Sequence, residues 1–135
     1  MNYPEVPIVK FRAIVSRLRG ADGCPWDKKQ TFETLTKYVL EEAKEVVDAI
    51  GSGDRSAICE ELGDLLLQVV LLSQLAEEEG AFDLDDVVEG ITQKMIRRHP
   101  HVFGDVKVDG VEDVLRNWEA IKSAEKKAKT LESQT

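Results

Sequence analysis

Apolar residues recur along this chain at the three- and four-residue spacing of helices that bury one side. The first such segment carries Ile8, Phe11, Val15 and Leu18, and Gly20 ends it. Further segments show the same spacing, and none alternates convincingly in the way that indicates a strand. We therefore expect an all-α fold of about five helices.

The second and third expected helices form a hairpin. The second begins after Asp27 or Thr31, which both suit a helix N-cap, and it runs to about Ile50. The sequence GSGD then breaks the chain, and Asp54 is suited to cap a helix over residues 55–79. A connection this short makes the two helices antiparallel neighbours.

The third expected helix is apolar on nearly every face. Its centre, residues 65–72, reads LLLQVVLL. A helix of this kind is surrounded by other elements, which a small domain achieves most easily in a dimer. We expect helical hairpins to assemble a four-helix-bundle-like core across a dimer.

Two more helices complete the expected domain. Asp83 caps the fourth, which ends before Pro100 because proline cannot continue a helix. The fifth starts near Gly110 and fades into a polar segment. The expected all-α domain covers residues 1–125, and residues 126–135 form a polar tail that we expect to fray.

Composition and charge narrow the functional classes. The 135 residues suit one domain, and the net charge of −8 argues against nucleic acid and anionic membranes as partners. No apolar run reaches the roughly eighteen residues of a membrane span, and the N-terminus lacks the pattern of a secretion signal. Cys24 and Cys59 have neither metal-ligand nor redox spacing. We expect a cytoplasmic protein.

Four carboxylates lie beside the apolar positions of the hairpin. Glu42 and Glu45 are three residues apart on the second helix, and Glu61 and Asp64 have the same spacing on the third. The antiparallel hairpin places both pairs at a similar height. Charges gathered in this way would force the helices apart or become protonated. A hard divalent cation removes the conflict, and all-oxygen ligands favour Mg²⁺ or Mn²⁺ over Zn²⁺.

The alternative interpretation is that these residues form solvated helix faces. A single glutamate pair is more simply explained in this way, and we interpret Asp48 as a solvated residue of such a face. Two pairs with the same spacing, each beside an apolar stripe, favour a metal site instead.

A concentrated basic patch of Lys94, Arg97 and Arg98 ends the fourth helix. These cations either complement the negative C-terminus of the helix or hold phosphate groups, since guanidinium binds phosphate oxygens in a bidentate fork. An anionic substrate of this acidic chain needs such a patch or a metal ion. Nearby, His99 and His101 lack a third ligand, which favours loop structure over a metal site.

Two stretches of the hairpin, LEEAKEVVDAI and ELGDLLLQVV, follow the pattern E-E-x-x-E, a spacer and E-x-x-D. Three other stretches flank them in the chain: GCPWD, RRHPHVFGD and NWEAIK. Together they resemble the signature and the flanking motifs of the MazG family of nucleoside triphosphate pyrophosphohydrolases. The resemblance covers about residues 8–125.

This resemblance implies an all-α, dimeric enzyme that uses Mg²⁺ to cleave nucleoside triphosphates to monophosphate and pyrophosphate. It implies that Glu42, Glu45, Glu61 and Asp64 are the metal ligands. Glu41 matches the first glutamate of the signature, and either Glu41 or Glu45 would deprotonate the attacking water. The implied biological role is removal of non-standard or surplus nucleotides.

The resemblance also bears on the substrate-binding residues. It favours Lys94 and Arg97 as groups that hold the triphosphate, and Arg98 is a further candidate from the same basic patch. It suggests that Trp118 stacks on the base with Lys122 near phosphate, and packing is the alternative role for Trp118.

Two other functions stay open. One is a non-catalytic helical dimer or interaction domain with a structural acidic metal site, because GCPWD and RRHPHVFGD look most like the N-terminal of the two domains that family members often carry. The other is a narrower deoxynucleotide pyrophosphatase of the dUTP or dCTP type. A panel of triphosphates distinguishes them.

Overall fold

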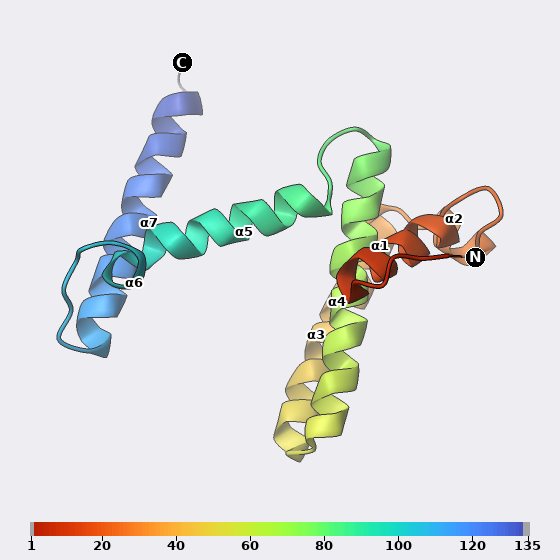
Figure 1. Ribbon diagram of the computed structural model, residues 1–135, viewed down its shortest axis with the longest axis horizontal. Helices are drawn as coiled ribbons and strands as arrows, with labels where there is room; N and C mark the ends of the chain where they lie inside the picture. The colour runs from red at the N-terminus through yellow and green to blue at the C-terminus, as the bar shows by residue number, and fades with distance from the viewer. Residues whose placement is uncertain (1, 134–135) are drawn as a thin grey trace. The chain divides into compact units, whose positions relative to one another are not determined.

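The computed structural model describes residues 2–133, and this part of the chain contains seven helices and no strand (Figure 1). The all-α prediction is confirmed. The helices are α1 Pro7–Leu18, α2 Pro25–Lys29, α3 Phe32–Ser52, α4 Arg55–Glu78, α5 Leu84–Arg98, α6 Pro100–Phe103 and α7 Val111–Ser133. The five longer helices match the expected segments.

The two short helices, α2 and α6, are additional to the five that the sequence predicts. Each begins with a proline, Pro25 in α2 and Pro100 in α6. Proline suits the first position of a helix because its φ is already helical and its missing N–H is not needed there. The prolines that interrupt the longer helical patterns therefore start single turns of their own.

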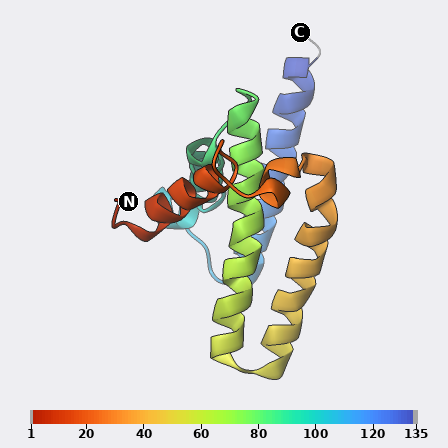
Figure 2. The same ribbon diagram turned by 90° about the vertical axis from the view of Figure 1, so that its right-hand side faces the viewer.

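The α3–α4 hairpin is confirmed, and the two helices lie side by side in both ribbon views (Figures 1 and 2). Thr31 is the N-cap of α3, where its side chain accepts a hydrogen bond from the Thr34 amide. Gly53, at a φ of 74°, ends α3 in the left-handed conformation that glycine adopts without strain. Asp54 caps α4 by accepting from the amides of the next turn, as the sequence predicts.

A single buried cluster holds α1, α3 and α4 together. α1 and α3 both contact α4, and Figure 2 shows α1 lying obliquely beside it. The fully or nearly fully buried members are Val15, Leu35, Val70, Leu71, Leu75 and Leu84. The cluster takes three of these residues from the C-terminal half of α4, so this half has the better packed environment.

Other apolar side chains of α4 are exposed in the described chain. These are Leu62 and Leu66 in its N-terminal half and Val69 just beyond its midpoint. On α3, Leu40, Val47 and Ile50 are exposed as well. The chain alone therefore buries only part of the apolar surface that the hairpin carries.

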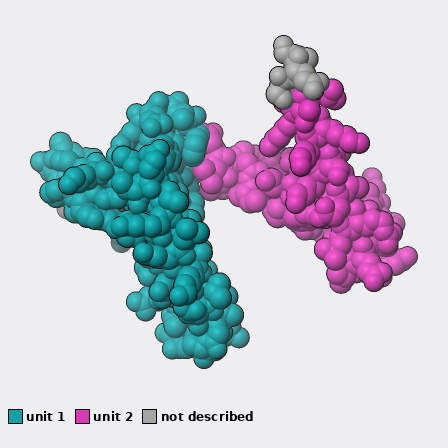
Figure 3. Space-filling model, turned by 180° about the vertical axis from the view of Figure 1, so that it is seen from behind, with its two compact units in different colours: residues 1–84 teal, residues 85–135 magenta. Residues whose placement is uncertain are grey.

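The chain divides into two compact units, residues 1–84 and 85–135, which Figure 3 colours separately. In the second unit, α7 continues to Ser133, past residue 125 at which we expect the domain to end. The fraying of residues 126–135 stays a prediction, and residues 134 and 135 lie outside the described part. No helix between residues 2 and 133 combines the length and the apolar character needed to cross a membrane.

Candidate functional site

The α3–α4 hairpin brings three of the predicted carboxylates together. Glu42 lies on α3, and Glu61 and Asp64 lie one turn apart on α4. One carboxylate oxygen from each residue can be chosen so that all three lie within 4.8 Å of one another. Glu42 and Glu61 are half-buried and Asp64 is exposed, so the group is open to solvent on one side.

Burial and the close approach of these charges raise the pKa of two of the carboxylates. Partial burial raises the pKa of Glu42, and the charge of Asp64 raises it further. Burial is also the largest cause that raises the pKa of Glu61, followed by the same Asp64 charge. Both carboxylates are therefore harder to ionise than an isolated glutamate, which is the electrostatic conflict that the sequence predicts.

Glu45 and Glu41 stand at the edge of this group. Glu45 is not one of the three residues whose oxygens converge. Its charge nevertheless contributes to the raised pKa values of Glu42 and Glu61, so it lies close enough to act on both. Glu41 acts in the same way on Glu42. Both side chains are exposed.

No arginine or lysine between residues 2 and 133 forms an ion pair with Glu42, Glu45, Glu61 or Asp64. Protein cations therefore leave the repulsion uncompensated. Three converging carboxylates supply hard oxygen ligands, and such a set fits a divalent ion of the Mg²⁺ class.

The predicted basic residues lie in the second unit, on α5 and α7. Arg97 and Arg98, at the end of α5, both contact Glu125 of α7. Arg98 also lies over the ring of Trp118, with 5.1 Å between its guanidinium carbon and the ring centre. The two arginines and the tryptophan thus belong to one cluster.

Lys94 and Lys122 occupy the same two helices as this cluster. Lys94 is one turn before Arg97 on α5, and Lys122 is one turn before Glu125 on α7. Lys94 is half-buried and Lys122 is exposed, and neither forms an ion pair with the described residues. Their ammonium groups carry positive charge that no carboxylate of the described chain neutralises directly.

The family model for the "MazG nucleotide pyrophosphohydrolase domain" matches residues 30–103, which include the whole hairpin and α5. The chain belongs to the MazG family. It is 48% identical over 127 residues to a nucleoside triphosphate pyrophosphohydrolase of Escherichia coli K12, covering 93% of this chain and 48% of that protein. It is 58% identical over 116 residues to the Bacillus subtilis protein YabN, covering 86% of this chain and 24% of YabN.

A solved structure supports the fold of this MazG domain. The crystal structure of a mazG-related protein from Thermotoga maritima matches it with a TM-score of 0.67 and 28% sequence identity. The match covers 84% of this chain and 96% of that one. The chain spans about a quarter to a half of the two curated relatives described above, so their activities pass to it only as a proposal.

The histidines of this MazG domain pack within the second unit. Nδ1 of His99 lies 2.6 Å from the Met95 carbonyl oxygen, and the His99 ring meets Trp118 edge-on. His101 lies beside His99, with 5.5 Å between the ring centres. His99 lies in the connection between α5 and α6, as the loop interpretation predicts, whereas His101 lies within α6.

The sequence alone does not predict the contacts of two charged residues of the MazG domain. Glu125 is the last residue of the expected domain, at the edge of the polar tail, although its position three residues after Lys122 and seven after Trp118 puts all three on one helix face. Arg19 follows α1 and pairs with Glu78 at the end of α4. Spacing gives no signal for Arg19, because its partner is 59 residues away.

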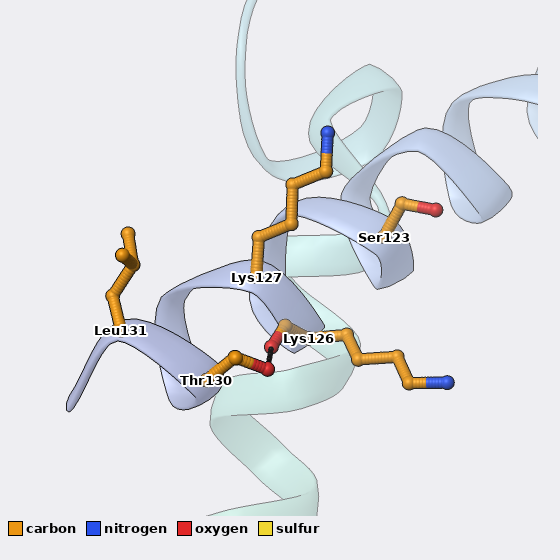
Figure 4. Close-up of a pocket in the computed structure, with 5 residues that line it drawn as sticks. All are labelled: Ser123, Lys126, Lys127, Thr130 and Leu131. Carbon is orange, nitrogen blue, oxygen red and sulfur yellow. Dashed lines mark hydrogen bonds between the residues drawn. The ribbon is translucent and has the colours of Figure 1, made fainter. Parts of the chain in front are cut away.

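A surface hollow on α7 has none of the predicted site residues in its lining. It is lined by Ser123, Lys126, Lys127, Thr130 and Leu131 (Figure 4). The side chains of Lys126 and Lys127 point in different directions in Figure 4. The two ammonium groups do not converge on one point, so the hollow offers no focused anion site.

Proposed function

We propose that this chain hydrolyses nucleoside triphosphates to nucleoside monophosphate and pyrophosphate in a Mg²⁺-dependent reaction. The observation that carries the proposal is the convergence of Glu42, Glu61 and Asp64 without a protein cation to neutralise them. Membership of the MazG family and the name of the E. coli relative support this activity and this class of substrate.

In this proposal Glu42, Glu45, Glu61 and Asp64 hold the metal. Mg²⁺ fits because every ligand is a carboxylate oxygen, and Mn²⁺ is the alternative of similar chemistry. When bound, the ion supplies Lewis-acid activation of phosphate oxygens and of water. The same charge also favours the ionised forms of Glu42 and Glu61, whose pKa values are raised first by burial and then by the neighbouring carboxylates.

The protein side chains carry out the proton transfer. Glu41 or Glu45 accepts a proton from the water that attacks the triphosphate, and both are exposed at the edge of the acidic group. The anhydride bond between the α and β phosphates breaks, and pyrophosphate leaves. Positive charge near the leaving group lowers the barrier, because negative charge accumulates there as the bond breaks.

Lys94, Arg97, Arg98 and Lys122 are the proposed phosphate-binding residues, and Trp118 is the proposed base-stacking residue. Arg97 is the more accessible of the two arginines, because 49% of its side chain is exposed and only 13% of the Arg98 side chain is. Arg97 is therefore the stronger candidate for direct contact with substrate, and Arg98 acts more through the packing of the cluster.

A homodimer is the proposed assembly. The exposed apolar residues of the hairpin support it, namely Leu40, Val47, Ile50, Leu62, Leu66 and Val69. Burial of these side chains against the hairpin of a second chain would complete a four-helix core and remove apolar surface from water. A cytoplasmic location and a role in clearing non-standard or surplus nucleotides belong to the same proposal.

The test is incubation of the protein with Mg²⁺ and a panel of ribo- and deoxynucleoside triphosphates, with separation of the products. Monophosphate and pyrophosphate in equal amounts are expected from at least one substrate. Diphosphate and orthophosphate would point to a different hydrolase, and no product from any substrate would favour a non-catalytic domain. Glu61→Gln keeps the size of the side chain and removes its charge, so we expect it to lower kcat about 100-fold or more by loss of a ligand.

A further inference from the structure

Glu125 of α7 contacts two consecutive arginines at the end of α5. Its Oε1 accepts a hydrogen bond from Nε of Arg97 at 2.5 Å, and its Oε2 accepts one from Nη2 of Arg98 at 2.9 Å. Consecutive side chains leave a helix about 100° apart. One carboxylate thus brings together two guanidinium groups that α5 alone would direct apart.

The two arginines are held in different environments. Arg98 is largely buried, and it is fixed by Glu125 on one side and by the Trp118 ring on the other. Arg97 is half-exposed, and Glu125 is its one partner among residues 2–133. Arg98 therefore anchors the carboxylate, and the carboxylate in turn presents Arg97 to solvent.

The way in which Arg97 is held leaves part of its guanidinium free. This group has a side edge that includes Nε and an end edge formed by Nη1 and Nη2. Glu125 takes Nε, and neither Nη1 nor Nη2 has a partner in the described chain. The two Nη groups form the fork that matches two oxygens of a phosphate.

We propose that Glu125 is a positioning residue of the phosphate site, which fixes Arg97 through Nε so that its two Nη groups receive the triphosphate. The inference rests on the proposed function, in which Arg97 binds substrate phosphate. Glu125 itself does not touch the substrate. An arginine that is already held loses less rotamer freedom when the anion binds, so the affinity is higher.

The sign of the effect separates this role from simple electrostatics. Removal of the Glu125 charge makes the cluster more positive, so a charge-only account predicts tighter binding of an anion to Glu125→Gln. The positioning role predicts weaker binding to the same variant. The Gln side chain keeps the size of Glu and can still accept one hydrogen bond, which limits the structural disturbance.

The experiment measures the dissociation constant of inorganic tripolyphosphate by calorimetry with Mg²⁺ present, together with KM and kcat for a triphosphate substrate. We expect Glu125→Gln to raise the dissociation constant and KM about 10-fold and to change kcat about 2-fold or less, because preorganisation acts on binding. Glu119→Gln, on an exposed residue of α7 with no ion pair in the described chain, is the matched control and should match the wild type.

A double-mutant cycle with Arg97→Gln shows whether Glu125 affects tripolyphosphate binding through Arg97. If Glu125 acts through Arg97, Glu125→Gln adds nothing once Arg97 is replaced. Independent effects that multiply would overturn the inference, as would unchanged or tighter binding to Glu125→Gln. If Arg97→Gln alone leaves binding unchanged, then the phosphate role of Arg97 in the proposed function fails instead.

A second substitution covers the case in which Glu125→Gln does not fold. Glu125→Asp keeps the charge on a shorter side chain, so it holds Arg97 less firmly. We expect an intermediate rise in the dissociation constant of tripolyphosphate, with the far-ultraviolet circular dichroism of the wild type. A folded Glu125→Asp protein with wild-type affinity would contradict the positioning role.

Discussion

At the scale of single residues, two glutamate environments in this chain have opposite electrostatics. Glu61 has like charges around it, and burial together with these charges raises its pKa. Glu125 has two arginines around it, and hydrogen bonds, first from Arg98 and then from Arg97, lower its pKa to about 2. The first environment lacks positive charge and suits a cation. The charge of Glu125 is already neutralised by the two arginines, and this contact joins α7 to α5.

The pKa of Glu125 leads to a prediction about acid stability. A carboxylate whose folded pKa lies below its unfolded value of 4.5 stabilises the fold above that value, and this contribution is lost as the pH falls towards about 2. We therefore expect Glu125→Gln to lower the free energy of unfolding at pH 7. We also expect the difference from wild type to shrink as the pH decreases from about 4.5 to about 2.

Urea unfolding followed by circular dichroism at a series of pH values measures this difference. Other carboxylates titrate over the same range, so the comparison is between variant and wild type at each pH. Glu119→Gln is the control and should give a difference near zero throughout. A Glu125→Gln difference that stays constant with pH would show that the ion pair does not stabilise the fold in this way.

Individual site residues differ in how far the sequence predicts them. The convergence of Glu42, Glu61 and Asp64 follows from helical spacing and a short turn, both of which are local. Glu45 shares that spacing but lies outside the converging group, because spacing fixes the helix face and not the reach of each side chain. Glu125 is missed because its arginines lie 27 and 28 residues away, across a turn that spacing does not describe.

At the scale of elements, Arg19 ties three helices together. It follows α1, donates to the Asp27 carbonyl oxygen in α2, and pairs with Glu78 at the end of α4 at 2.7 and 2.8 Å. The same guanidinium reaches the carbonyl oxygen of Gln30, just before α3. A side chain that is only 9% exposed thus satisfies groups from separate segments, which fixes the path of the GCPWD loop.

Arg19→Ala is expected to destabilise the protein by about 3 kcal/mol, since charge-assisted hydrogen bonds contribute strongly and the part-buried carbonyl oxygens of Asp27 and Gln30 each lose a donor. Chemical denaturation measures the change. Arg116→Ala is the matched control, because Arg116 also forms an ion pair, with Asp113, but is 72% exposed. Its loss should cost about 0.5 kcal/mol or less. Equal effects of the two substitutions would contradict the role of Arg19.

The elements themselves follow from the sequence more completely than the contacts between them. Caps at Thr31 and Asp54 and a left-handed glycine at Gly53 define the hairpin through neighbouring residues alone. The short helices α2 and α6 are missed because a single turn is too short for a periodic pattern to develop. Gly23 is required by a contact invisible in the sequence, since a Cβ there would lie 2.1 Å from the Leu18 carbonyl oxygen.

At the scale of the whole molecule, the exposed apolar side chains of the hairpin lead to a prediction about assembly. Leu62, Leu66 and Val69 repeat at intervals of four and three residues along α4, the spacing of a helix–helix seam. If a second chain covers them, Leu66→Asp buries an unpaired charge at the centre of the seam, which costs several kcal/mol. We expect this variant to be monomeric and the wild type dimeric.

Sedimentation velocity over a range of protein concentrations distinguishes the two states. Leu131→Asp makes the same change at an exposed leucine on α7, and it should leave the dimer intact. A wild-type protein that stays monomeric at high concentration would remove the dimer from the proposal. A Leu66→Asp protein that remains dimeric would place the interface elsewhere.

The proposed hydrolysis depends on a metal site formed by the carboxylates of α3 and α4. Crystals grown with Mn²⁺ test this site, because the anomalous scattering of manganese locates the ion independently of the protein atoms. We expect a manganese peak among the carboxylate oxygens of Glu42, Glu61 and Asp64, and no such peak in crystals of Glu61→Gln. Manganese found only at another position in an active wild-type enzyme would show that these three carboxylates are not the metal ligands.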